Sequence, residues 1–92
     1  MSVVIIGGNE RMEQQYKQIC EKHKCKAKVF TRMSGNLKTQ IGQPDLISLF
    51  TSTVAHKRVH CALKEAERYN IRVERAHSSS ASALENVLQG CC

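Results

Sequence analysis

The chain begins with a continuous apolar run that leaves few folds open to it. Residues 2–6 read Ser-Val-Val-Ile-Ile and lead directly into Gly7-Gly8. Unbroken runs of branched apolar residues are typical of strands that are buried on both faces, as in parallel sheets covered by helices. The run therefore predicts a parallel α/β fold.

The rest of the chain alternates strand-like runs with helical stripes. Further strands are expected at residues 26–31, 46–50 and 71–76, and helices are expected after Asn9, after Thr51-Ser52-Thr53 and after a serine run that ends at Ser80. In the connection at residues 33–44, Leu37 and Ile41 suggest one face of a short helix. This alternation predicts right-handed crossovers in a small Rossmann-like, flavodoxin-like three-layer domain with about three helices. The expected strand order is second, first, third, fourth.

Several residues mark the expected helix ends. Asn9 is a good N-cap for the first helix, and the hydroxyls of residues 51–53 are candidate caps for the second. Ser82 and Glu85 have the spacing of a capping box in the last helix, and Gly90 is a reasonable stop. We therefore expect a single domain at residues 1–90, followed by a tail at residues 91–92.

Length and cysteine content indicate which oligomeric state, cellular compartment and thiol redox state to expect. A four-stranded sheet in 92 residues has a thin core, which favours a homodimer. The apolar run is too short for a membrane helix and lacks the basic flank of a secretory leader, so we expect a cytoplasmic protein without a membrane partner. Five cysteines, an odd number without a C-x-x-C pair, favour reduced thiols.

The loops that follow the first, third and fourth strands are the candidate ligand site. In this strand order they meet at the switch point of the sheet, where open α/β folds usually bind ligands. Helix starts offer free N–H groups, which suit an anion, although Ser and Thr before helices are also ordinary N-caps. The candidate ligand-binding residues are Gly7, Gly8, Asn9, Ser52, Thr53, His56, Lys57, His77, Ser78, Ser79 and Ser80.

The second helix has the charge pattern that departs most from expectation. Its first turns carry His56, Lys57, Arg58 and His60, and its first acidic residue is Glu65. Cations at a helix N-terminus oppose the helix dipole by about 0.3–1 kcal/mol each when exposed. An anion at this end would remove the conflict, while the alternative is that Lys57 and Arg58 simply extend into solvent. A net charge of +6 also favours anionic partners.

Metal or haem binding is a second possibility. His56 and His60 share a helix face, and His77, Cys25 and Cys61 are further candidate ligands for a transition metal or haem. The tight ligand spacing of structural zinc sites is missing, however. No nucleophile elbow, complete dinucleotide fingerprint or P-loop occurs either, so the sequence leans away from an enzyme.

Three segments together resemble a known bacterial family. They are VVIIGGNERMEQQYKQIC, PDLISLFTSTVAHKRVHCALKEAERYNIRV and HSSSASALENVL, in this order. They resemble domain-of-unknown-function family 2325, whose pattern corresponds here to Gly7, Gly8, Asp45, Thr53, His56, Ser78, Ser79 and Ser80. The resemblance implies a Rossmann-like fold and a site role for His56, and it implies no activity. Some relatives have an arginine where this chain has His77.

The leading hypothesis is a non-catalytic ligand-binding or sensing module that takes a small anion at the strand ends. One alternative is a haem- or metal-binding redox or sensor protein with His and Cys ligands. The other alternative is nucleic-acid binding through the basic second helix, although an aromatic content of 4% leaves few residues for base stacking.

Overall fold

The computed structural model describes residues 1–31 and 42–91. Its strands are β1 (Ser2–Ile6), β2 (Lys26–Phe30), β3 (Leu46–Phe50) and β4 (Arg72–Ala76). Its helices are the 3-10 turn η1 (Glu10–Met12), α1 (Glu13–Lys22), α3 (His56–Arg68) and α4 (Ala81–Cys91). The expected elements are thus present, while the short helix expected around Leu37 and Ile41 lies outside the described residues.

The four strands form one parallel sheet in the order β2-β1-β3-β4. The register places Val4 between Lys28 on β2 and Ile47 on β3. β1 and β3 lie at the centre, which explains why both are mostly apolar and why every residue of β3, including Ser48, is buried. The predicted strand order is confirmed.

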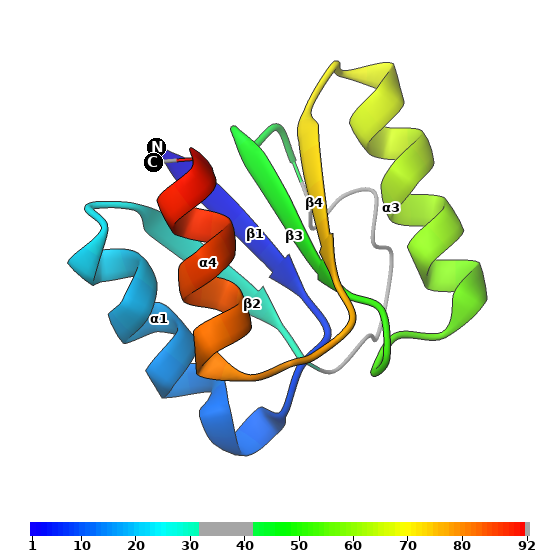
Figure 1. Cartoon of the computed structure of the whole chain (residues 1–92). Helices are drawn as coiled ribbons and strands as arrows, with labels where there is room; N and C mark the ends of the chain where they lie inside the picture. The colour runs from blue at the N-terminus through cyan, green and yellow to red at the C-terminus, as the bar shows by residue number, and fades with distance from the viewer. Residues whose placement is uncertain (32–41, 92) are drawn as a thin grey trace.

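Helices cover both faces of this sheet (Figure 1). α1 and α4 lie over one face and α3 lies over the other. Tyr16, Ile19, Leu84 and Leu88 from the two helices pack on one side of the central strands, and Ala62 and Ala66 of α3 pack on the other. The predicted three-layer α/β architecture is confirmed. Within the described residues, no helix has the length and apolarity needed to span a bilayer.

The helix ends differ in part from the expected caps. Asn9 does act as a cap, but of the η1 turn that leads into α1: its Oδ1 accepts the Arg11 N–H at 3.0 Å, whereas α1 itself has no side-chain cap. The cap of α4 is Ser80, whose Oγ accepts the Ala83 N–H at 3.2 Å. The expected capping box of Ser82 and Glu85 is wrong, because both residues lie inside the helix. Gly90 is also inside α4, which reaches Cys91.

The amino ends of the two central strands are joined by a pair of hydrogen bonds. The Ser2 N–H donates to Asp45 Oδ2 at 2.7 Å, and the Asp45 N–H donates to the Ser2 carbonyl at 2.8 Å. Asp45 thus sits at the edge of the sheet opposite the loops that the sequence selects as the site. It fixes the register of β3 against β1 from that edge.

Candidate functional site

The loop after β1 is held directly against the loop after β3. The Gly8 N–H donates to Thr53 Oγ1 at 2.7 Å, and Thr53 Oγ1 in turn donates to the Phe50 carbonyl at 3.1 Å. Thr53 was expected to cap α3, and that expectation is wrong because its hydroxyl belongs to the turn that crosses back to β1. The helix itself starts at His56, after Ala55.

Close packing explains the pair of glycines at this junction. Both have φ of +93°, in the region that side chains rarely adopt. A Cβ on Gly7 would lie 2.4 Å from Val54 Cγ2, and a Cβ on Gly8 would lie 2.8 Å from Tyr16 Cε2. The glycines are therefore required by the meeting of β1, α1 and the loop after β3, whether or not a ligand binds beside them.

Tyr16 joins the loop after β1 to the loop after β4. Its hydroxyl accepts the Asn9 N–H at 3.2 Å and donates to the Ser79 carbonyl at 2.5 Å. The side chain is fully buried and its ring lies 5.3 Å from that of Phe50. Its spacing from Met12 and Ile19 predicts only that Tyr16 lies on the apolar face of the first helix. A buried tyrosine in place of phenylalanine is nevertheless a sign that the hydroxyl has a partner.

The three loops therefore meet at the carboxyl edge of the sheet, but several of their N–H groups already have partners. Gly7 donates to the Phe30 carbonyl at 2.9 Å, Gly8 to Thr53, Asn9 to Tyr16, and Ser80 to Ser78 Oγ at 3.2 Å. The expectation that these loops present free amides is thus wrong for these four residues, because the contacts between the loops use them.

The start of α3 is the part of this edge that stays open. No side chain caps it and its first turn holds no acidic residue. The Arg58 and Val59 N–H groups reach the Ala55 carbonyl, which leaves those of His56 and Lys57 without a partner in the described part of the chain. The side chains of His56 and Lys57 are exposed, and the His56 ring lies 5.6 Å from that of His60.

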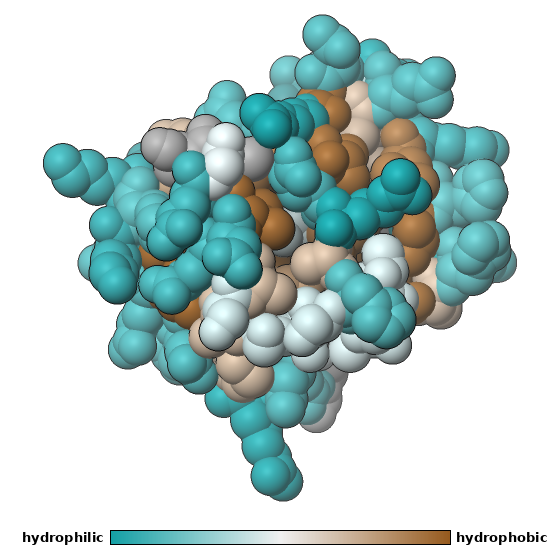
Figure 2. All heavy atoms as spheres, viewed as in Figure 1, coloured by the Kyte–Doolittle hydropathy of each residue, from teal (hydrophilic) through white to brown (hydrophobic). Residues whose placement is uncertain are grey.

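The candidate residues divide between the two sides of the sheet edge. Gly7, Gly8, Asn9, Thr53 and Ser79 are tied together by the hydrogen bonds above. α3 and α4 both begin at this edge but over opposite faces, so His56 and Lys57 lie on one side and the link from His77 to Ser80 lies on the other (Figure 1). The carboxyl edge of the sheet lies toward the bottom of the view in Figure 2, which shows there a band of white and beige residues of intermediate hydropathy with teal, hydrophilic residues around it.

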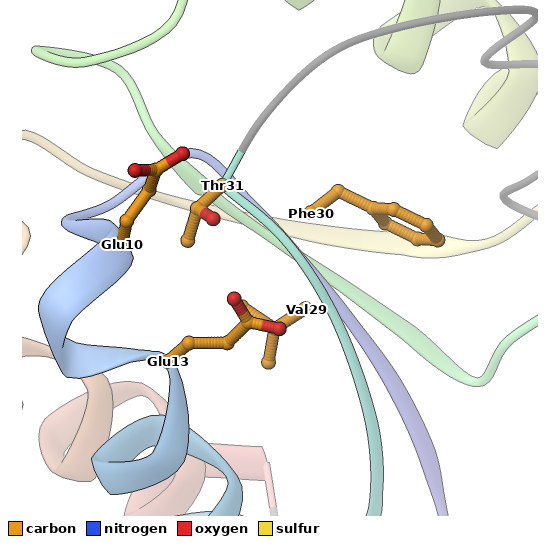
Figure 3. A pocket seen from close by; sticks show the side chains of 5 residues that line it. All are labelled: Glu10, Glu13, Val29, Phe30 and Thr31. Atoms are coloured by element: carbon orange, nitrogen blue, oxygen red, sulfur yellow. The ribbon is translucent and has the colours of Figure 1, made fainter.

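Two hollows lie near this edge, and they have opposite charge. One, of about 410 Å³, is lined by Lys57, His60, Cys61 and Lys64 along α3. The other, of about 390 Å³, is lined by Glu10, Glu13, Val29, Phe30 and Thr31. In Figure 3 the two carboxylates turn toward Val29 and Thr31, while Phe30 points away. Carboxylates repel anions, so of these two hollows only the one on α3 suits an anionic ligand.

The candidate metal ligands are spread over the molecule. In residues 1–31 and 42–91, no group of three or more His, Cys, Asp or Glu side chains could hold a metal ion. Cys25 precedes β2 at the opposite edge of the sheet, where its thiol donates to the His23 carbonyl at 3.4 Å. Of the five candidates, His56 and His60 are in ring contact and Cys61 lines the hollow beside His60. Two imidazoles on one exposed helix do not make a complete metal or haem site.

The fold is similar to that of a de novo designed Rossmann fold protein. That structure superimposes with a TM-score of 0.64 at 16% sequence identity, over 96% of this chain and 93% of the designed one. At this identity the similarity shows the fold alone. No curated protein matches the chain.

The sequence itself matches the model of a family described as an uncharacterized protein conserved in bacteria, domain-of-unknown-function family 2325. The match covers residues 2–91, from β1 to the last residue of α4. The chain is therefore a member of this bacterial family, with a Rossmann-like four-stranded fold.

Proposed function

We propose that the protein is a non-catalytic module that binds a small anionic ligand at the start of α3, at the carboxyl edge of the sheet. The observation that carries the proposal is that α3 begins with His56, Lys57 and Arg58 and has neither a side-chain cap nor an acidic residue in its first turn. α4, in contrast, is capped by Ser80, and α1 continues from the η1 turn, which is capped by Asn9 and has Glu10 in its first turn, although α1 itself has no side-chain cap.

The electrostatics of the helix start favour an anion. Its N-terminus carries about half a positive charge and unsatisfied N–H groups. Lys57 adds a full positive charge there, and its exposed side chain makes the unfavourable energy small without a ligand. A bound phosphate or carboxylate would accept hydrogen bonds from the His56 and Lys57 N–H groups and would neutralise the cations at once. Thr53 carries the hydroxyl nearest in sequence to this helix start, but it is engaged with Gly8 and Phe50. Ser52 carries the next candidate hydroxyl.

The use of the loop hydroxyls supports binding rather than catalysis. The hydroxyl of Thr53 is engaged with Gly8 and Phe50, and that of Ser80 with the Ala83 N–H. A nucleophilic hydroxyl needs a neighbouring base and must be free to attack a substrate. These two hydroxyls instead hold the loops in place.

Thermal unfolding with a panel of anions tests the proposal. Phosphate, sugar phosphates, nucleotides and small dicarboxylates are each added up to millimolar concentrations. A ligand at about 100 times its Kd stabilises the native state by about 2.7 kcal/mol. In a domain of this size that free energy raises Tm by more than about 10 °C.

Single substitutions test whether the anion that raises Tm binds at the start of α3. His56→Ala and Lys57→Ala should remove most of the ligand-induced rise in Tm, while Lys17→Ala on α1 should leave it intact. A panel without any stabilising anion would refute the proposal, and so would a stabilisation that His56→Ala and Lys57→Ala both retain.

A further inference from the structure

The outward face of α3 carries a line of cations along the whole helix. Lys57, His60, Lys64 and Arg68 are exposed and recur at intervals of three or four residues, which places them along one side of the helix. We call these four residues the basic stripe. Val59, Ala62, Leu63 and Ala66 are the residues that pack toward the sheet. The stripe therefore faces away from the core.

The cations of this stripe differ from those of α1 in their partners. On α1, Lys17 lies 3.8 Å from Glu13, and Lys22 lies 3.5 Å from Glu85 of α4. On α3, Lys57 and Lys64 have no acidic partner among the described residues, and Arg68 lies 4.0 Å from the buried carboxylate of Glu65. The stripe thus has charge to offer to another molecule.

Two features give the stripe a shape suited to a polyanion. A hollow of about 410 Å³ is lined by Lys57, His60, Cys61 and Lys64, so an anionic group that enters it lies beside two lysines. At the far end, the Arg68 guanidinium lies 5.5 Å from the centre of the Tyr69 ring, which restrains it near the helix.

We propose that the basic stripe binds the phosphodiester backbone of a nucleic acid strand. From Lys57 to Arg68 the helix rises about 16 Å, since each residue adds about 1.5 Å. One strand of duplex DNA presents a phosphate about every 3.4 Å along its axis, so the stripe spans several phosphates. A small anion occupies one position, whereas a repeating anion uses the full length of the stripe.

An acidic protein surface fits this stripe less well than a nucleic acid. Protein interfaces have an apolar or aromatic centre from which charged residues are depleted. Tyr69, at the end of the stripe, is the one large exposed apolar residue of the described part of α3 and its C-cap. Backbone phosphates need cations and little else, which is what the stripe supplies.

Fluorescence anisotropy with labelled 20-nucleotide DNA and RNA, single-stranded and duplex, tests the proposal. Binding should weaken as salt rises from 50 to 200 mM. If three to four phosphates are neutralised, the slope of log K against log salt should be about −2 to −3 for single strands and about −2.7 to −3.6 for duplexes. Lys64→Ala combined with Arg68→Ala should weaken binding at 50 mM salt by about tenfold or more and reduce the slope by about 1.4–1.8.

The matched control combines Lys17→Ala with Lys22→Ala on α1. Both double variants lower the net charge from +6 to +4, so a difference between them reports position rather than total charge. The α1 variant should lose less than about twofold in affinity by the same reasoning. Equal losses in the two variants would overturn the proposal, as would absent or salt-insensitive binding, or tighter binding of polyglutamate than of nucleic acid.

The nucleic-acid proposal and the small-anion proposal can be tested separately. Arg68 lies at the far end of α3 and does not line the hollow beside Lys57, so Arg68→Ala alone should weaken nucleic-acid binding and leave stabilisation by a small anion unchanged. Loss of nucleic-acid binding with intact small-anion stabilisation supports the stripe as a separate surface. If no small anion stabilises the protein but nucleic acid binds through the basic stripe, the small-anion proposal is refuted and the nucleic-acid proposal is supported.

Discussion

The two helical layers of the molecule are built differently. In the layer of α1 and α4 the helices contact each other and are linked by the Lys22–Glu85 ion pair and by Tyr16 through Ser79. Side chains cap the η1 turn that leads into α1 and the start of α4. The described part of the other layer is α3, which begins without a side-chain cap and carries a basic outer face. The lysines of α1 named above lie beside carboxylates of the same layer, whereas Lys57 and Lys64 on α3 have no acidic partner among the described residues.

From this difference we expect the layer of α1 and α4 to contribute more to stability, and α3 to contribute more to the proposed binding. Polar side chains that hold loops together contribute to folding and are no longer free for ligands. Cations without an internal partner contribute little to folding and remain available. Substitutions in the two layers should therefore have opposite consequences.

The largest difference should come from truncation of a core side chain in the closed layer. Leu84→Ala on α4 removes a fully buried side chain and should lower the free energy of unfolding by about 2–5 kcal/mol. Lys64→Ala on α3 should change it by less than about 0.5 kcal/mol. Urea unfolding followed by circular dichroism measures both. Comparable losses would show that α3 is as tightly integrated as α4.

A smaller effect should come from the hydroxyl that links the loops. Tyr16→Phe keeps the ring against Phe50 but leaves the Ser79 carbonyl and the Asn9 N–H without their partner. The cost should be about 1–3 kcal/mol. Tyr69→Phe, at an exposed tyrosine, is the control and should be almost neutral. Equal melting temperatures for the two variants would mean that the Tyr16 hydroxyl does not stabilise the loops.

The smallest effect should have the opposite sign. Ala55→Asp gives α3 the cap and the negative charge that it lacks, and should raise the free energy of unfolding by about 0.5–1 kcal/mol. The same carboxylate should occupy the N–H groups and repel an anion, so ligand-induced stabilisation should fall.

Ala55→Ser separates the two contributions, because it adds a cap without a charge. It should stabilise the protein but reduce anion binding less than Ala55→Asp does. If Ala55→Asp leaves stabilisation by phosphate unchanged, the anion does not bind at the start of α3.

The arrangement of the strands could be predicted because it follows from local patterns. Val3–Ile6 is apolar without interruption and Leu46–Phe50 is apolar apart from Ser48, and strands buried on both faces are typical of the centre of a covered parallel sheet. The Asn9 cap was equally local, since its partner is two residues away. Patterns within one element were therefore enough for the sheet, its order and one helix start.

The contacts at the carboxyl edge could not be predicted because their partners are distant in sequence. Thr53 bonds to Gly8, which is 45 residues away, and Tyr16 bonds to Ser79, which is 63 residues away. From sequence alone, the hydroxyls of Thr53 and Tyr16 could equally well bond to a partner nearby in the chain. Among neighbouring serines, the choice of Ser80 over Ser82 as the cap depended on where α4 begins, and helix boundaries are the least predictable property.

The Asp45 contact at the amino edge limits how this domain can respond to a ligand. β1 and β3 are fastened there by Asp45 and at the other edge by Gly8 and Thr53, so one strand cannot slide along the other without breaking bonds at both ends. Sliding of β1 along β3 is therefore energetically unfavourable. A ligand at the carboxyl edge would therefore act on a sheet whose two central strands are held together at both ends.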